Sequence, residues 1–129
     1  PALTKNPVFL YMMDDFTRPS PFQMDVAVDV SDVMDVKWAM LDAMDSQFYE
    51  WLPWIMKSPS TPPENPADRL AWLKETWDPY FKSRAEKSRI TLARRYGALR
   101  ADTVTHAEYF ELCEYGECPN PEDLWALFP

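Results

Sequence analysis

The stretch that decides the fold is VAVDVSDVMDVKWAMLDAMDSQFYEWLPW, residues 26–54, because it joins a strand pattern directly to a helix pattern. Residues 26–30 are apolar at nearly every position, which is typical of an inner strand covered on both faces. Apolar residues then recur every three or four positions, as on one face of a helix: Met34, Trp38, Leu41, Met44, Phe48, Trp51 and Leu52. Ser31 is the predicted N-cap and Pro53 the predicted end, so we expect one continuous helix of about five turns, packed on a core.

Segments on either side extend this pattern to an α/β protein. Residues 8–13 are continuously apolar and predict a second inner strand, while the alternation over residues 106–115 favours a strand over a helix. The proline-rich residues 57–66 are interpreted as a surface loop rather than a linker, because either flank alone is too short for a robust domain. Three strands do not complete a doubly wound sheet. The chain therefore looks like the trailing part of a larger α/β domain, with a small stand-alone α/β protein as the alternative.

Local signals place the remaining helices. Asn65 followed by Pro66 predicts a helix start, and Pro79 is expected to break or kink that helix. Gly97 is a candidate left-handed C-cap. Asn120 predicts the cap of a final short helix.

Composition excludes several classes of function. The 129 residues favour one domain, and two isolated glycines cannot build a phosphate-binding loop. A single histidine cannot make a three-histidine zinc site. The net charge of −8 argues against nucleic acid as a partner. The longest apolar run has six residues, so no membrane span is expected, and the lack of signal-peptide features predicts the cytoplasm.

Three of the candidate site residues lie in the first half of the chain. Asp14 and Asp15 follow the first predicted strand, where α/β folds place functional groups, and paired carboxylates can share a proton or bind a cation. Adjacent strand residues face opposite ways, however, so the two need not act together. Gln47 offers a side-chain amide next to the hydroxyl of Ser46, with no histidine nearby to activate that hydroxyl.

The other candidates lie near the end of the chain. His106 and Glu108 fall on one face if the segment is a strand, where they would form an acid–base pair; the alternative is an ordinary hydrogen-bonded histidine. Cys113 and Cys118 have the spacing of a small disulfide or of half a metal site. Neither has a matching second pair of ligands, so we expect two reduced thiols of structural type.

Residues 26–54 and 106–129 together resemble the C-terminal half of the PIG-L / LmbE-like family of zinc-dependent de-N-acetylases. The matching positions are Val28-Asp29, Lys37, Ser46-Gln47, Phe48-Tyr49-Glu50-Trp51, Ala107-Glu108, Phe110, Glu114-Tyr115-Gly116 and Leu127-Phe128-Pro129. Residues 8–22, with Asp14-Asp15-Phe16 and Pro19, resemble the stretch before that strand in one branch of the family. The resemblance covers most of the chain and is weakest over residues 57–100.

The resemblance implies the C-terminal part of a Rossmann-like, three-layer α/β domain that is incomplete on its own. In the family, zinc is held by a His-Pro-Asp-Asp motif and a further mid-chain histidine, neither of which occurs here. The family's His-x-Ser-Gln histidine falls on Met44, whose thioether cannot transfer a proton. The resemblance therefore implies a zinc ion in the parent protein, and we expect that this chain alone does not bind it. This expectation is the same for an active and for an inactive parent protein.

Two hypotheses of function follow. The first is a C-terminal segment of a metal-dependent de-N-acetylase, supplying pocket wall and subunit contacts, with Asp14, Asp15, Gln47, His106 and Glu108 as pocket candidates. The second is a non-catalytic binding or assembly protein built on the same half-fold. In either case the unpaired strand edge predicts a partner, namely the N-terminal half of the domain, a second chain, or further copies in a homo-oligomer.

Overall fold

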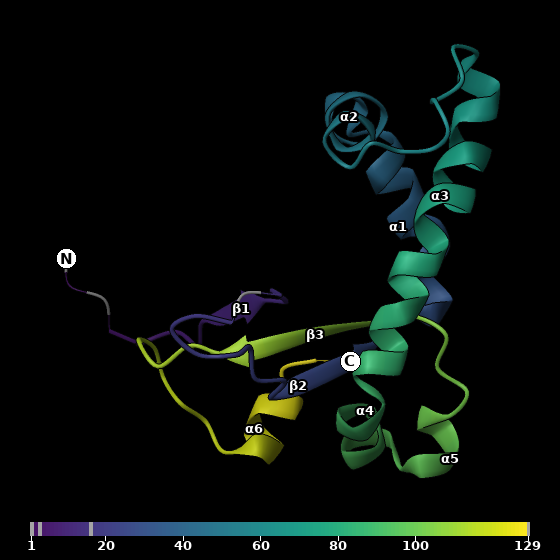
Figure 1. Ribbon diagram of the computed structural model, residues 1–129. Helices are drawn as coiled ribbons and strands as arrows, with labels where there is room; N and C mark the ends of the chain where they lie inside the picture. The colour runs from purple at the N-terminus through teal and green to yellow at the C-terminus, as the bar shows by residue number, and fades with distance from the viewer. Residues whose placement is uncertain (1, 3, 16, 129) are drawn as a thin grey trace.

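The computed structural model describes residues 2, 4–15 and 17–128 and shows an α/β fold. In chain order its elements are β1 (Leu10–Met12), β2 (Val26–Asp29), η1 (Ser31–Val33), α1 (Met34–Asp42), η2 (Ser46–Trp51), α2 (Leu52–Ile55), α3 (Pro66–Lys87), α4 (Arg89–Tyr96), α5 (Ala98–Ala101), β3 (Ala107–Leu112) and α6 (Pro121–Trp125). Figure 1 shows an L-shaped molecule, in which a small sheet forms the foot and α1, α2 and the first half of α3 form an upright arm. Phe16 and Pro129, two residues of the family resemblance, lie outside the described residues.

The sheet has the order β1-β3-β2, and both pairings are antiparallel. The prediction that residues 106–115 contain a strand is confirmed by β3. The prediction that residues 8–13 and 26–30 are both inner strands is wrong, because β1 and β2 are the two edges and β3 lies between them. Apolar composition reports how well a strand is covered by side chains, whereas its place in the sheet depends on hydrogen-bonded neighbours that composition does not reveal.

Both faces of the sheet are covered, which gives three layers. On one face, Ala27 and Tyr109 pack with Leu92 of α4 and residues of α3 and α5. On the other face, Val26 and Val28 pack with Leu124 of α6. Alternate residues of β2 thus enter different clusters, and this explains why valine and alanine occupy successive positions.

The two edges of the sheet differ. Beyond β2, the Tyr96 hydroxyl accepts a hydrogen bond from the Asp29 backbone N–H at 3.3 Å, and the Arg95 guanidinium donates to the Ala27 carbonyl at 3.5 Å. Helix α4 therefore covers the outer edge of β2 with side-chain partners. In the described part of the chain no strand pairs with the outer edge of β1, where Tyr11 and Met12 are more than a third exposed.

Gly116 holds the chain after β3 against the segment before β1. A side-chain carbon placed at Gly116 would lie 2.3 Å from the Pro7 carbonyl oxygen, so only glycine fits this close approach. The Glu117 N–H donates to that same carbonyl at 3.1 Å, and the Cys113 N–H donates to the Phe9 carbonyl at 3.0 Å. Backbone pairing between the two segments thus continues past the end of β1.

The arm begins with the predicted helix, but the helix is not continuous. It stops at Asp42, resumes as the wide π-helical turns of η2, and runs through Pro53 into α2. Ser31 is not its N-cap; instead the Ser31 hydroxyl oxygen accepts hydrogen bonds from the N–H groups of Thr105 and His106 at 3.1 and 3.2 Å. Pro53 has no N–H to donate to the preceding turn, and its ring crowds that turn. The preceding turn belongs to η2, whose π-helical turns are wider than those of an α-helix.

Helix α3 runs through Pro79 without ending, so the predicted break there is wrong; α3 and α4 are separated only at Ser88. The hydrogen bond that Pro79 cannot make would reach the carbonyl of Glu75, and both residues are exposed. The Asn65 cap is confirmed, because its side chain accepts from the Ala67 N–H. Gly97 ends α4 with φ +82° and ψ 154°, a region that is almost exclusive to glycine.

Candidate functional site

A groove of about 330 Å³ lies between α1 and the start of β3. Its walls are apolar side chains from successive turns of α1 and the residues around it, including Val33, Met40 and Met44. Its polar groups are the side chains of Lys37, from α1, and Glu108, from β3. The groove therefore combines an apolar lining with two convergent charged groups, which is the usual character of a small-ligand site.

Lys37 and Glu108 form the central contact of this groove. The Lys37 Nζ atom lies 2.5 Å from Glu108 Oε1, and the two side chains are only 17% and 28% exposed. The same ammonium lies 4.5 Å from the ring centroid of Phe81 on α3, within range of a cation–π interaction. A charge pair this well covered holds its helix and strand in one orientation, because separating the charges would leave each without a partner.

A second cavity, of about 420 Å³, is also lined by this ion pair. It shares Lys37, Leu41 and Glu108 with the groove and is otherwise walled largely by aromatic and aliphatic side chains, among them Phe48. Arg84 also lines it, with its guanidinium 4.7 Å from the ring centroid of Tyr80. The ion pair thus borders two largely apolar hollows.

His106 lies two residues before Glu108, but the side chains of the two residues have different partners. The His106 Nε2 atom lies 2.8 Å from Asp78 Oδ1 of α3, and Nδ1 lies 2.9 Å from the Thr105 hydroxyl. In the neutral tautomer that satisfies both contacts, Nε2–H donates to Asp78 and Nδ1 accepts from Thr105. Both ring nitrogens are hydrogen-bonded, so His106 ties β3 to α3.

Asp78 is the charged end of this tie. Burial by itself would raise the pKa of the Asp78 carboxyl, but hydrogen bonds from Lys82 and His106 lower it, and the net shift is downward. Lys82 Nζ lies 2.6 Å from Asp78 Oδ2, one helical turn away on α3. The carboxylate therefore stays ionised and keeps the histidine in position at neutral pH.

The remaining predicted site residues lie outside the groove lining. Gln47 is exposed on η2. Asp15 pairs with Lys87, at 3.4 Å between Oδ1 and Nζ, and Asp14 lines a separate hollow beside Tyr11. Of the five predicted pocket residues, the structure therefore brings only Glu108 into the groove, with His106 adjacent in the chain.

Lys37 is a charged residue of the groove that was not predicted as a site residue. It lies three positions after Met34 and four before Leu41, both of which are buried. The spacing therefore places a charge on the apolar face of α1, where it needs a partner. That conflict between charge and position is the signal in the sequence that identifies it.

The described residues contain neither a cluster of metal ligands nor a membrane-spanning helix. No group of three or more His, Cys, Asp or Glu side chains is placed to hold a metal ion there. Cys113 is a buried free thiol whose S–H donates to the Tyr11 hydroxyl at 3.1 Å, and Cys118 is an exposed free thiol. None of the described helices combines the length and apolar character that crossing a membrane requires.

Comparisons of this chain with models of protein families, with curated proteins and with solved structures find no match.

Proposed function

We propose that this chain is the C-terminal segment of a metal-dependent de-N-acetylase of the PIG-L / LmbE type. It would supply a pocket wall and contact surface for hydrolysis of the amide of an N-acetylated sugar or related compound. One observation carries the proposal: Lys37, Met44 and Glu108, which come from separate motifs of the resemblance, line one groove.

The convergence of these three residues supports the proposal because Glu108 is far from the other two in the sequence. Lys37 and Glu108 are 71 residues apart, yet their charged atoms are in contact. Met44 follows the end of α1, at the position of the family's histidine, and lines the same groove. In an unrelated protein, positions chosen by a family motif would have no reason to meet at one surface.

The zinc of the family does not fit on the residues described here. A zinc site needs about four ligands of His, Cys or carboxylate type, and the described residues offer no such group. Both ring nitrogens of His106, the sole histidine, are hydrogen-bonded. The proposal therefore assigns the metal to residues outside this chain, and we derive no catalytic step through it.

The test compares the natural gene product that contains these residues with the 129-residue chain alone. Bound zinc is measured by elemental analysis after dialysis, and acetate release is measured with N-acetylglucosamine as the probe. We expect zinc and acetate release from the gene product only. Lys37→Met should reduce acetate release, whereas Lys74→Met, on the exposed side of α3, should not.

Met44 allows a gain-of-function test. Met44→His restores the family's residue at its place in the groove, and we expect it to raise acetate release. Met40→His is the matched control, because Met40 lines the same groove without corresponding to the family's histidine. Stoichiometric zinc on the isolated chain, or a gene product without zinc and without acetate release, would contradict the proposal.

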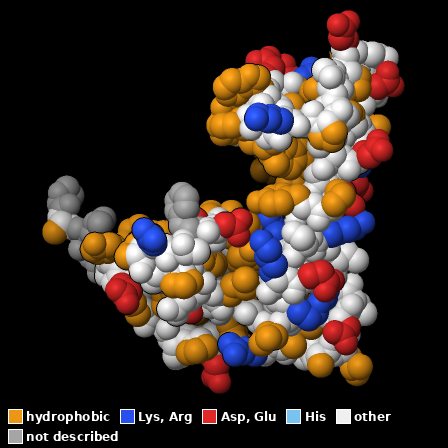
Figure 2. Space-filling view, viewed as in Figure 1, with side chains coloured by type: hydrophobic (Ala, Val, Ile, Leu, Met, Phe, Trp, Pro, Cys, Tyr) orange, Lys and Arg blue, Asp and Glu red, His pale blue; other side chains and the backbone are white. Residues whose placement is uncertain are grey.

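The second candidate function, a non-catalytic binding or assembly protein, is favoured by the apolar surface of the arm. Trp51, Trp54, Ile55 and Met56, from η2, α2 and the residue after it, are all exposed. Figure 2 shows hydrophobic side chains gathered at this end of the molecule. Stable association with a partner by a gene product that holds no zinc would favour this function over hydrolysis.

Both functions predict association through the sheet. The outer edge of β1 carries apolar side chains and has no strand beside it in the described part of the chain. Such an edge can pair with another strand. We propose that the N-terminal half of the domain, a second chain, or another copy of this chain covers it. Sedimentation of the isolated chain should show self-association, and a soluble monomer at high concentration with cooperative unfolding would oppose this.

A further inference from the structure

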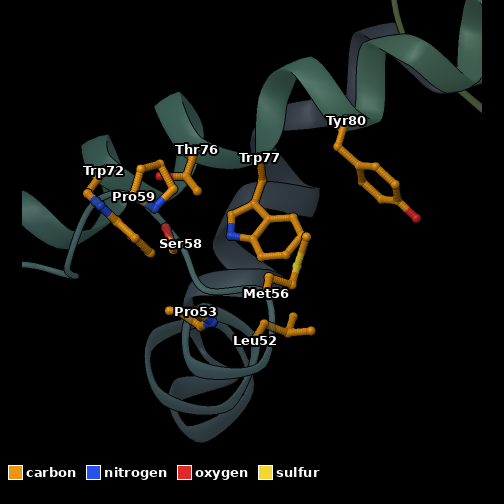
Figure 3. A pocket seen from close by; sticks show the side chains of 9 residues that line it. All are labelled: Leu52, Pro53, Met56, Ser58, Pro59, Trp72, Thr76, Trp77 and Tyr80. Atoms are coloured by element: carbon orange, nitrogen blue, oxygen red, sulfur yellow. The ribbon is translucent and has the colours of Figure 1, made fainter.

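A separate pocket lies in the arm, between α2, the loop that follows it and the first half of α3. Its volume is about 200 Å³. Figure 3 shows its lining: Leu52 and Met56 come from the α2 side, Ser58 and Pro59 from the loop, and Trp77 from α3. Neither Lys37 nor Glu108 lines this pocket, so it is distinct from the groove, although it shares Leu52, Met56, Trp77 and Tyr80 with the second cavity described above.

Two buried polar atoms of this lining have no hydrogen-bond partner among the described residues. They are the indole Nε1 of Trp77 and the hydroxyl oxygen of Ser58. Trp77 is 7% exposed, so its N–H has lost water without gaining an acceptor. In Figure 3 the indole nitrogen lies on the side of the ring that faces Ser58, so both atoms border the same space.

A neighbouring tryptophan, by contrast, has a hydrogen-bond acceptor within the chain. Trp72, one and a half turns earlier on α3, donates its indole N–H to the Ser60 hydroxyl at 3.0 Å. Trp77 has no such partner although it lies in the same helix and faces the same loop. Buried donors without acceptors are rare in folded proteins, and one that borders a cavity identifies where a ligand's acceptor belongs.

The lining determines the chemistry of that ligand. None of the described residues around the pocket is charged, so burying a carboxylate or an ammonium there would leave it without a counter-charge. The indole N–H can only donate, whereas the serine hydroxyl can donate or accept. A secondary amide has a carbonyl oxygen for the first and an N–H for the second. The aromatic and proline side chains suit an apolar body attached to it.

We propose that this pocket binds a small neutral secondary amide with an apolar substituent, whose carbonyl oxygen accepts from Trp77 Nε1–H and whose amide group hydrogen-bonds to Ser58. A water molecule occupies about 30 Å³ of liquid volume, so the space exceeds what one water fills. This site goes beyond the proposed hydrolase function and does not depend on it, because binding requires neither metal nor turnover.

The experiment is a titration of the chain with N-benzylacetamide, followed by the indole N–H signals in a nitrogen–proton NMR spectrum. Trp77→Phe assigns the Trp77 signal, because it removes the N–H and keeps an aromatic ring. We expect that signal to shift saturably as the amide is added. Phenylpropionate, an anion of similar size, should shift it far less.

Variants test the two hydrogen bonds separately. Trp77→Phe and Ser58→Ala should each weaken binding about two- to tenfold, the usual effect of one hydrogen bond. Trp54→Phe is the matched control, since Trp54 is exposed and outside the lining, and its affinity should equal that of the wild type. Urea unfolding of each variant checks its fold, and Ser58→Ala keeps the test valid if Trp77→Phe is unstable.

Three outcomes would overturn the proposal. The first is a Trp77 signal that does not move up to the solubility limit of the amide, as expected if the pocket holds only water. The second is equal affinity of Trp77→Phe, Ser58→Ala and Trp54→Phe, which would place the amide elsewhere. The third is tighter binding of phenylpropionate than of the amide, which would assign an anion site.

Discussion

A double-mutant cycle on the Lys37–Glu108 ion pair should separate the coupling energy of the pair from the unfolding free energy that each single substitution costs. The variants Lys37→Met and Glu108→Gln remove one charge each with little change in side-chain volume, and the double variant removes both. At 2.5 Å and an effective dielectric constant of about 20, the Coulomb attraction alone is about 7 kcal/mol. Desolvation and side-chain ordering offset most of that. Because both side chains are mostly covered, we expect a coupling of about 1–3 kcal/mol, above the range of exposed pairs.

The assay is urea denaturation of the wild type, both single variants and the double variant, followed by tryptophan fluorescence. A control cycle uses Lys74 and Asp35, which link α3 to α1. Their charged atoms are 3.5 Å apart and their side chains are 41% and 97% exposed. That cycle should give a coupling below about 0.5 kcal/mol and should weaken with added salt.

Equal coupling energies in the two cycles would refute the expectation that the covered pair is the stronger one. An unchanged free energy of unfolding in Lys37→Met would also contradict this expectation, because an unpaired Glu108 carboxylate in an apolar groove should be costly.

Three further perturbations test the core, a strained backbone position and a buried phenol. Leu92→Ala should cost about 2–5 kcal/mol in urea denaturation, while Ile90→Ala, at a position 72% exposed on the same helix, should stay within about 0.5 kcal/mol; similar losses would misplace the core. Gly97→Ala has open space around its new methyl group but a φ of +82°, so it should lower the thermal midpoint through strain of about 1–3 kcal/mol, and an unchanged midpoint would refute that strain. Burial, and then the hydrogen bond to Asp42, raise the pKa of the Tyr49 hydroxyl above the 10.0 of a free tyrosine, so the folded state holds that proton more tightly than the unfolded chain. The stability that Tyr49 contributes is therefore present below about pH 10 and lost as the pH rises above it. Alkaline denaturation should spare Tyr49→Phe relative to the wild type, and identical curves would contradict this.

Local rules were sufficient for the features that depend on a few neighbouring residues. Asn65 and Asn120 cap their helices as expected, because an amide side chain beside a helix start accepts the N–H groups that have no intrahelical partner. Gly97 ends α4 as expected, but its ψ of 154° lies outside the left-handed helical region that was predicted. The prediction of a strand at residues 26–30 is confirmed by β2, whose alternate side chains enter two different clusters.

The candidate site was only partly predictable, because its residues meet partners that are distant in the sequence. Glu108 and His106 were recognisable as a charge and a titratable ring two residues apart, but their partners, Lys37 and Asp78, are 71 and 28 residues away. No spacing rule relates such distant positions. The two unpartnered polar atoms of the arm pocket are likewise invisible in the sequence, because a missing partner can be recognised only when all neighbours are known.

By itself, the sequence determined where most strands and helices lie, the caps at Asn65 and Asn120, and part of the apolar face that is buried, because these depend on backbone preferences and on side-chain periodicity over a few turns. Only the tertiary structure decided which strand is central, where the first helix breaks, and that α3 continues through Pro79. Each of these depends on what lies beside a residue in space. A strand becomes central when two others pair with it, and a proline is tolerated when the carbonyl it leaves unpaired faces water.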